Sequence, residues 1–180
     1  MIKKQGQTNS MDVKNSTDKN IVLIGMPTSG KSTVGVILAK ILGMDFIDTD
    51  LVIQKREGTR LEHIIEQRGV DGFIKTEEQA LLEIVVKNTV IATGGSAVYS
   101  KTAMEHLAEN SIIIYLRVAK EELKKRLKNV KERGVVLKPG ENIDEMFDAR
   151  SKLYEEYSDI TIFEDGFSIE DTVQAIKDAI

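Results

Sequence analysis

The sequence predicts a three-layer α/β domain, in which a parallel sheet lies between two layers of helices. Three observations support this prediction: apolar runs of strand length recur along the chain, helical patterns separate them, and a glycine-rich loop directly follows the first apolar run. Strands separated by helices require right-handed crossovers, which make neighbouring strands parallel. The functional site is therefore expected at the carboxyl ends of the strands, where such folds bind their ligands.

Five strands are expected, each from a short apolar run. The first run, Ile21-Val22-Leu23-Ile24, is apolar throughout and is therefore expected to be buried on both faces. The other four strands are expected at 44–47, 89–93, 111–116 and 160–163.

Helices are expected between these strands. The helix after the glycine-rich loop should end at Gly43 and bury Val34, Ile37, Leu38 and Ile41. Three short helical pieces are then punctuated by Gly58, Gly69 and Gly72, and the last of them, from about Asp71, carries Leu81, Leu82, Val85 and Val86. Later helices are expected at 119–130, at 142–157 and after a Ser168 cap, with Ile169, Val173 and Ile176 facing inward.

Length and composition fit one globular domain. The chain has 180 residues, of which 41% are hydrophobic and 30% charged, so a sizeable core is expected. Residues 1–19 are expected to form a flexible polar tail before a domain at 20–180. The net charge of −4 disfavours nucleic-acid and acidic membrane partners, and no apolar run approaches the roughly 18 residues of a membrane span. Because cysteine and a secretory signal are both absent, the expected compartment is the cytoplasm.

The loop GMPTSGKST, at 25–33, fits the phosphate-loop pattern G-x-x-x-x-G-K-[ST] without a mismatch. In such a loop the backbone N–H groups point at a phosphate, and the following helix adds the positive end of its dipole. Lys31 is expected to reach the β- and γ-phosphates, and Ser32 to ligate Mg²⁺. The remaining expected nucleotide contacts are Gly25, Thr28, Ser29, Gly30 and Thr33. The sequence therefore predicts a nucleoside triphosphate site.

Two carboxylates close the second expected strand, in the run FIDTD. Asp48 and Asp50 are two residues apart, so they would share one face of an extended chain. One can serve the metal, and the other can orient a substrate hydroxyl or accept its proton. A strand-end turn, or a helix N-cap by Asp50, is the alternative. Beside a phosphate loop, the functional interpretation is favoured.

Two further segments suggest an acceptor site. Gly94 and Gly95 follow the third expected strand, where paired glycines let backbone approach a ligand; a tight turn is the alternative. Arg150 occupies an otherwise apolar face of its expected helix, which is costly unless the cation has an anionic partner or reaches solvent. A substrate carboxylate or phosphate would serve, and an internal ion pair is the alternative.

The glycine-bearing loop at 131–141 contains Arg133. A basic residue on a mobile flap can close over a γ-phosphate and stabilise the charge that is transferred. The other basic residues between Lys120 and Arg133 are interpreted mainly as a solvated helix face.

From about Ile21 to its end, the chain resembles the shikimate kinases, small P-loop phosphotransferases related to nucleoside monophosphate kinases. The resemblance rests on the order and spacing of GMPTSGKS, FIDTD, the GF pair at 72–73, TGGSAV, a short arginine-bearing lid and RSKLYEEYSDI. It implies a P-loop kinase fold with sheet order 2-3-1-4-5, and a monomer that uses ATP and Mg²⁺. It also implies that the acceptor is the hydroxy-acid shikimate, phosphorylated at its 3-hydroxyl in aromatic amino acid biosynthesis.

On the nucleotide side, the resemblance implies that Lys31 contacts the phosphates and that Ser32 and Asp48 hold the metal shell. Arg126, in the helix before the lid, matches the adenine-stacking arginine of the family, and Arg133 matches its lid arginine.

On the acceptor side, the resemblance implies that Asp50 binds substrate hydroxyls and acts as the base. Gly94 and Gly95 would line the pocket, and Arg150 would grip the carboxylate. The family has a second carboxylate-binding arginine directly after the phenylalanine of the GF pair, where this chain has Ile74. Shikimate would then bind weakly, another side chain would compensate, or the acceptor would be another small hydroxylated molecule.

A nucleotide-dependent switch without metabolite kinase activity is the alternative of a different class. GTPase switches read their base with N-K-x-D after a late strand, but the chain has RVAKEELKK at 117–125 and EDGFS at 164–168. The candidate acceptor groups would also have no purpose in a switch, so a small-molecule kinase is favoured.

Overall fold

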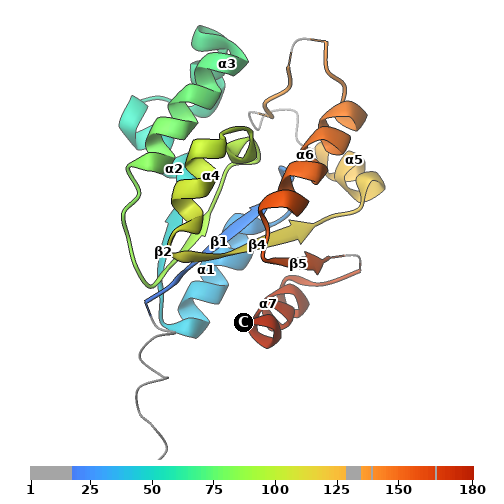
Figure 1. Cartoon of the computed structure of the whole chain (residues 1–180). Coiled ribbons are helices and arrows are strands. Elements are labelled where there is room, and N and C mark those ends of the chain that lie inside the picture. The colour runs from blue at the N-terminus through green and yellow to red at the C-terminus, as the bar shows by residue number, and fades with distance from the viewer. Residues whose placement is uncertain (1–17, 129–134, 139, 165) are drawn as a thin grey trace, which may run out of the picture.

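The computed structural model describes residues 18–128, 135–138, 140–164 and 166–180. At its centre is an all-parallel sheet of five strands in the order β2-β3-β1-β4-β5 (Figure 1). The strands are β1 (Asn20–Gly25), β2 (Asp45–Asp48), β3 (Thr89–Ala92), β4 (Ser111–Arg117) and β5 (Ile160–Phe163). The predicted fold class and strand order are confirmed, and each strand begins and ends within one residue of its expected position.

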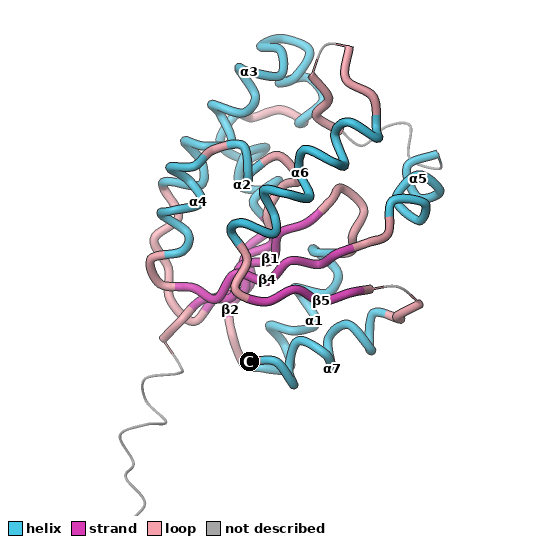
Figure 2. The backbone as a smooth tube through the Cα atoms, turned by 45° about the vertical axis from the view of Figure 1, so that its right-hand side comes forward, coloured by secondary structure: helices cyan, strands magenta, loops and turns pink. Residues whose placement is uncertain are grey.

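Helices cover both faces of this sheet. Figure 2 shows α1 (Lys31–Leu42) and α7 (Ile169–Ala179) on one face, with α4 (Lys101–Ala108) and α6 (Ile143–Tyr157) on the other. The remaining helices are α2 (Thr49–Glu57), α3 (Leu61–Leu82), α5 (Lys120–Lys128) and the short 3₁₀ helix η1 (Ala97–Tyr99). Ser168 caps α7, as predicted, in a reciprocal pair with Asp171.

The alternation of side chains along β1 divides the core into two layers. Ile21 and Leu23 pack with the apolar faces of α1 and α7, whereas Val22 and Ile24 pack under α4 and α6. All four side chains are at most 4% exposed, as expected for a central strand with helices on both faces.

A third, smaller core holds α2 and α3 together. It contains Ile53, Ile64, Phe73, Ala80 and Val136, so a residue from the segment before α6 packs into this unit. α3 is interrupted at Gly69, whose φ of 68° is left-handed, which confirms a break predicted there. Gly72, by contrast, continues the helix.

Several details of the predicted helices are wrong. Ile41 and Ile169 were expected to face inward but are 51% and 40% exposed. Val85 was expected within the helix from about Asp71 but lies beyond its end and is 84% exposed. Each lies where a helix no longer covers the core: in the last turn of α1, beyond the end of α3, and at the first residue of α7. Helix α4 was not among the predicted elements, although it buries Met104 and Leu107.

Across the part of the chain that is described, no helix combines the length and the apolar character that crossing a membrane requires.

Candidate active site

A cavity of about 510 Å³ lies where β1, β2 and β3 end. The parallel register pairs Ala92 of β3 with both Leu23 of β1 and Asp48 of β2, so these three carboxyl ends lie side by side. The lining comes from the loop after β1, from α2 and α3, from the turn after β3, and from Val136 and Arg150. The position of this cavity confirms the expectation that a site lies at the carboxyl ends of the strands.

The loop after β1 has the backbone geometry that a phosphate loop requires. Gly25 has a φ of 150°, and a Cβ at this residue would lie 2.6 Å from the carbonyl oxygen of Leu116. Gly30 is left-handed, with a φ of 85°, and is the N-cap of α1. Thr28 also has a positive φ, of 65°. The loop therefore turns directly into the amino end of a helix, where anions bind.

Lys31 is folded back against this loop. It is only 7% exposed, and its ammonium group donates to the carbonyl oxygens of Gly25 and Met26 at 2.8 and 2.7 Å, and to Ser29 Oγ at 3.2 Å. Burial lowers the pKa of this amine to about 8, although the negative charge of Asp50 acts in the opposite direction. Bound phosphate oxygens would add negative charge and favour the protonated, cationic form.

The two carboxylates after β2 are arranged differently from the prediction. Helix α2 begins at Thr49, so Asp50 lies in its first turn, and the shared face of an extended chain is wrong. Asp48 caps the helix, because its Oδ1 accepts a hydrogen bond from the Asp50 N–H at 3.0 Å. The cap that was weighed for Asp50 is thus made by Asp48, and Asp50 is free to line the cavity.

Asp50 has the protonation behaviour of a candidate base. Burial, and then the neighbouring charge of Asp48, raise the pKa of its carboxyl group to about 6, whereas Lys31 acts to lower it. A carboxylate with a raised pKa is a stronger proton acceptor than an exposed one and is still largely ionised near neutral pH.

Gly94 and Gly95 form a wall on which several functional groups converge. A Cβ on Gly94 would lie 2.3 Å from Oε1 of Glu77 and 2.9 Å from Oδ1 of Asp50. A Cβ on Gly95 would lie 2.9 Å from the ring of Pro27 and 3.2 Å from Nη1 of Arg150. Neither glycine has a positive φ, so close approach, rather than backbone conformation, requires glycine here.

Arg150 is 1% exposed, and the internal ion pair that was weighed for it is not formed with any described residue. Its Nε donates to the Tyr99 hydroxyl at 3.2 Å, its Nη1 to the Gly95 carbonyl at 3.2 Å, and its Nη2 to the Val136 carbonyl. Among the described residues, no carboxylate lies within ion-pair distance of this guanidinium. A buried cation on a cavity wall without a counter-charge is suited to an anionic ligand.

Glu77 is a site residue that the sequence prediction missed. It lines the cavity, is 1% exposed, and accepts a hydrogen bond from Ser96 Oγ at 2.6 Å. The signal was present, because Glu77 lies on the helical stripe that contains the buried residues Phe73, Ala80 and Leu81. A charged residue on an apolar face identified Arg150, and the same criterion would have identified Glu77.

A second cavity, of about 390 Å³, lies beside the loop on the other side. It is lined by Val118, Glu122, Arg126, Glu164, Gly166 and Phe167. Arg126 joins the two regions, because its Nη1 donates to the Thr28 carbonyl at 3.1 Å and its Nε to Glu122 at 3.0 Å. Arg126 therefore lies between the phosphate loop and this cavity.

The structure thus brings most of the predicted site residues together. Those on the large cavity are Thr28, Gly30, Lys31, Ser32, Thr33, Asp50, Gly94, Gly95 and Arg150. Gly25 and Ser29 support the loop, Asp48 lies at the start of α2, and Arg126 lines the second cavity. Arg133 and residues 131–134 of the expected lid lie outside the described residues.

The donors near the phosphate loop fit a magnesium ion. Within the described ranges, no cluster of three or more His, Cys, Asp or Glu side chains could hold a metal. Mg²⁺ in phosphotransfer sites is held by one or two protein oxygens together with phosphate oxygens and water. Ser32, exposed on the cavity lining, and Asp48, at the adjoining start of α2, are oxygen donors of this kind.

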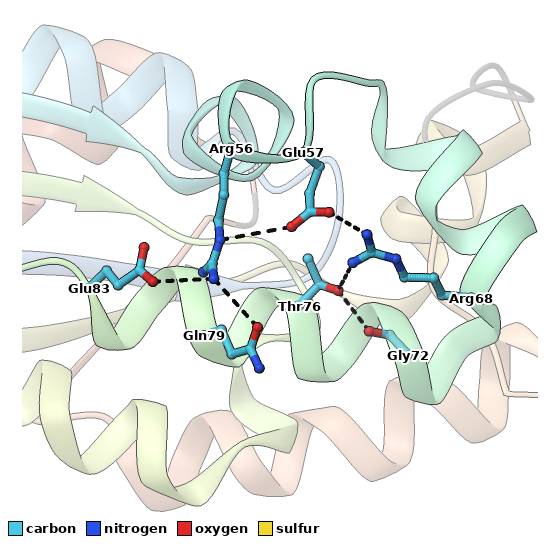
Figure 3. Close-up of polar contacts among 7 residues, drawn as sticks. All are labelled: Arg56, Glu57, Arg68, Gly72, Thr76, Gln79 and Glu83. Atoms are coloured by element: carbon cyan, nitrogen blue, oxygen red, sulfur yellow. Dashed lines mark hydrogen bonds and ion pairs between the residues drawn. The ribbon is translucent and has the colours of Figure 1, made fainter.

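A polar network fixes the two helices that carry the acceptor side of the cavity. Arg68 of α3 reaches Glu57 of α2 at 2.5 Å and Thr76 Oγ1 at 2.9 Å, and Thr76 in turn donates to the Gly72 carbonyl at 2.9 Å. Figure 3 shows these contacts between the two helices. Arg56 of α2 makes a second bridge, to Gln79 of α3 and to Glu83, the residue that caps the end of α3. Because Asp50 lies on α2 and Glu77 on α3, this network sets their relative positions.

We expect Arg68→Met to lower the free energy of unfolding by about 0.5–1 kcal/mol, because Arg68 is half exposed and its ion pair is partly screened. Urea unfolding followed by circular dichroism measures the change. Lys75→Met, an exposed site on the same helix, is the matched control and should leave the unfolding midpoint within error. Equal effects of the two variants would show that the bridge does not hold α2 on α3.

Known proteins resemble this chain along nearly its whole length. A sequence profile described as "Shikimate kinase" matches residues 27–180. A curated shikimate kinase from Pasteurella multocida is 37% identical over 166 residues, covering 90% of this chain and 95% of the relative. One from Haemophilus influenzae is 37% identical over the same length and covers 92% of the relative.

Solved structures agree with these sequence matches. A shikimate kinase from Acinetobacter baumannii, in complex with shikimate, superposes with a TM-score of 0.79 at 31% identity, covering 93% of this chain and 95% of that one. The enzyme from Aquifex aeolicus gives a TM-score of 0.74 at 33% identity, with coverage of 88% and 94%. A gluconokinase from Sinorhizobium meliloti, at 17% identity and a TM-score of 0.51, shares only the fold.

Proposed function

Because this chain belongs to the shikimate kinase family, we propose that it transfers the γ-phosphate of ATP to the 3-hydroxyl of shikimate. It is a phosphotransferase with an alcohol acceptor. The observation that carries the choice of acceptor is Arg150, a buried guanidinium with no ion-pair partner among the described residues, on the same cavity wall as Asp50. An acceptor held there by its carboxylate would present its hydroxyls to the space between Asp50 and the phosphate loop.

The nucleotide side binds and neutralises the phosphates. The backbone N–H groups of the loop and the amino end of α1 cradle them, and Lys31 leaves its carbonyl partners to contact the β- and γ-oxygens. Mg²⁺, with Ser32 and Asp48 contributing to its shell, supplies charge neutralisation between the phosphates when it is bound. Arg126 would contact the adenine from the second cavity.

The acceptor side positions a nucleophile. Asp50 aligns the hydroxyl and accepts its proton as the oxygen attacks the γ-phosphorus in line with the leaving ADP. Gly94 and Gly95 let the acceptor ring approach the backbone, and Arg150 fixes its carboxylate. Transfer needs little covalent chemistry from the protein, so positioning and charge stabilisation supply most of the rate.

The loop at 131–141 is proposed to close over the nucleotide and to bring Arg133 to the transferred phosphate. Closure would exclude water, which otherwise competes with the acceptor for ATP. The chain is further proposed to act as a cytoplasmic monomer.

A coupled assay of ADP release, with ATP, Mg²⁺ and shikimate, quinate or gluconate, tests the function directly. We expect saturable ADP release with shikimate. Proton–phosphorus correlation NMR should show that the product carries its phosphate on the 3-hydroxyl. Release that depends on another acceptor and not on shikimate would overturn the choice of substrate while leaving the reaction class. One observation favours another acceptor as the second candidate: this chain has Ile74 at the position where the family resemblance places a cation beside the carboxylate.

Arg150→Met is expected to raise the KM for shikimate by about 10- to 150-fold with little change in the KM for ATP, because one charged hydrogen-bonding partner is lost. Initial rates at varied shikimate and at varied ATP separate the two constants. The matched control is Lys152→Met, an exposed cation on the same helix, which should leave both constants unchanged. A parallel loss of ATP affinity would indicate that Arg150 holds the fold of the site rather than the acceptor.

A further inference from the structure

Glu77 is a buried carboxyl group on the wall of the acceptor pocket. Its Oε2 accepts one hydrogen bond, from Ser96 Oγ at 2.6 Å, and its Oε1 is buried without a hydrogen-bond partner. A Cβ on Gly94 would lie 2.3 Å from that oxygen, and one on Gly95 would lie 3.2 Å from Nη1 of Arg150. Glu77 and the guanidinium proposed to hold the acceptor carboxylate therefore face two adjacent residues of the same turn.

Charged groups face Glu77 from three other elements. Asp50, at the start of α2, adds a negative charge beside the same glycine. Lys31 of α1 and Arg150 of α6 act on Glu77 as positive charges. Neither cation is within ion-pair distance of Glu77. Their donors bond instead to backbone carbonyls and hydroxyls.

Its own helix supplies no counter-charge either. Glu78 turns away to Ser100. Glu62, in the first turn of α3, lines the same cavity with a further carboxylate. Ile74 lies three residues before Glu77, on the neighbouring surface of the helix, and is apolar. Within the described residues, Glu77 is thus a buried carboxyl with one hydrogen bond and no ion-pair partner.

We propose that Glu77 is a specificity-determining residue of this pocket, which takes up one proton from solvent as the carboxylate of the acceptor binds and returns it on release. When Glu77 is neutral, it does not repel the carboxylate of the acceptor. An arginine at position 74 would instead offset that repulsion with its positive charge. This inference rests on the proposed function, since it assumes an anionic acceptor held by Arg150.

The electrostatics of the unliganded pocket support this role. Burial raises the pKa of Glu77 to about 7; Asp50 also raises it, whereas the Ser96 hydrogen bond, Arg150 and Lys31 lower it. An incoming carboxylate adds negative charge and raises the pKa of Glu77 further. Below the free pKa the group is already neutral, and above it binding must draw in a proton, so acceptor affinity is highest on the acid side and falls as pH rises.

Isothermal titration of shikimate into the protein, without nucleotide or Mg²⁺, tests this inference. Titrations in two buffers of different ionisation enthalpy count the protons that are taken up. We expect Glu77 to take up nearly one proton at about pH 8 and little at about pH 6, with an affinity about tenfold weaker at the higher pH. A Kd that is independent of pH, with no proton uptake, would overturn the inference.

Two variants identify Glu77 as the group that titrates. Glu77→Gln keeps the size of the neutral form and should abolish proton uptake, with an affinity at about pH 8 close to that of the natural protein at about pH 6. Ile74→Arg places a cation beside Glu77 and stabilises its ionised form. It should therefore also abolish proton uptake, because Glu77 stays ionised when the acceptor binds. Uptake that survives in both variants would assign the proton to another group.

Glu78→Gln is the matched control, because it removes the adjacent carboxylate of α3, which bonds to Ser100 outside the cavity lining. It should keep the proton uptake of the natural protein. Thermal unfolding of each variant shows whether a lost signal reflects a lost fold, and Ile74→Arg leaves Glu77 itself in place. If shikimate neither binds nor turns over at any pH, the proposed function fails; if it turns over with a pH-independent Kd, this inference alone fails.

Discussion

Lys31→Ala is expected to abolish measurable phosphoryl transfer, with kcat falling by at least about 10²–10³-fold. The ammonium group is the one buried cation that the loop itself provides, and three hydrogen bonds hold it against the loop, from which it can turn to the phosphates when a nucleotide binds. In the transition state it opposes the charge that develops on the transferred group and on the leaving oxygen. ADP release under saturating ATP and shikimate measures the loss.

The control for this prediction must separate chemistry from loop structure. Lys40→Ala removes an exposed lysine from the last turn of the same helix and should retain full turnover. Lys31→Met keeps the aliphatic stem of the side chain but neither charge nor donors, so it should be as inactive as the alanine variant while unfolding near the natural temperature. Turnover within tenfold of the natural protein in either Lys31 variant would contradict the assignment.

The phosphate loop could be predicted in detail because its pattern is local. The spacing of Gly25, Gly30 and Lys31 specifies both a backbone path and a ligand, and the apolar run before it and the helical pattern after it fix its setting. The observed φ of 150° at Gly25, and the contact a Cβ there would make with Leu116, show that a side chain at this position would clash. Sheet order came from the family resemblance, since strand pairing depends on contacts distant in the sequence.

The acceptor side was predictable by residue but not by geometry. Asp48 and Asp50 were identified from their position at the end of a strand. Their different roles follow from the start of α2 at Thr49, which makes Asp48 the helix cap and places Asp50 in the first turn. Arg150 was found because a cation interrupts an apolar stripe. The choice between ligand and internal ion pair, however, required the positions of Tyr99, Gly95 and Val136, which lie 14 to 55 residues away.

Glu77 shows that the apolar face of a predicted helix has to be searched for acidic as well as basic side chains. Its partners, Ser96 and the glycine turn, come from β3's end and not from its own helix, so their proximity is a tertiary fact. The absence of an arginine at position 74 was visible in the sequence. The sequence did not show, however, that the carboxyl group of Glu77 is buried rather than exposed.

Asp50→Asn is expected to lower kcat by about 10²–10⁴-fold while changing the KM for ATP by less than about threefold. The amide keeps the size of the carboxylate but cannot accept the hydroxyl proton. Its nitrogen can still donate to an acceptor hydroxyl, so the KM for shikimate should change less than kcat. The same substitution at Asp45, an exposed residue at the start of β2, is the matched control and should leave turnover unchanged.

The split between kcat and the ATP constant distinguishes a base from a metal ligand. If Asp50 served mainly the magnesium shell, its loss would weaken the use of ATP and would be partly rescued by excess Mg²⁺. If it acts on the acceptor, the loss stays in kcat at every Mg²⁺ concentration, and uncoupled ATP hydrolysis by water persists, since the nucleotide half of the cavity is intact. The geometry favours the second outcome, because Asp50 lies beside Gly94 on the acceptor wall, whereas Asp48 lies at the cap of α2. Turnover that survives in Asp50→Asn would show that the hydroxyl loses its proton without this carboxylate, and the transfer would then rest on alignment alone.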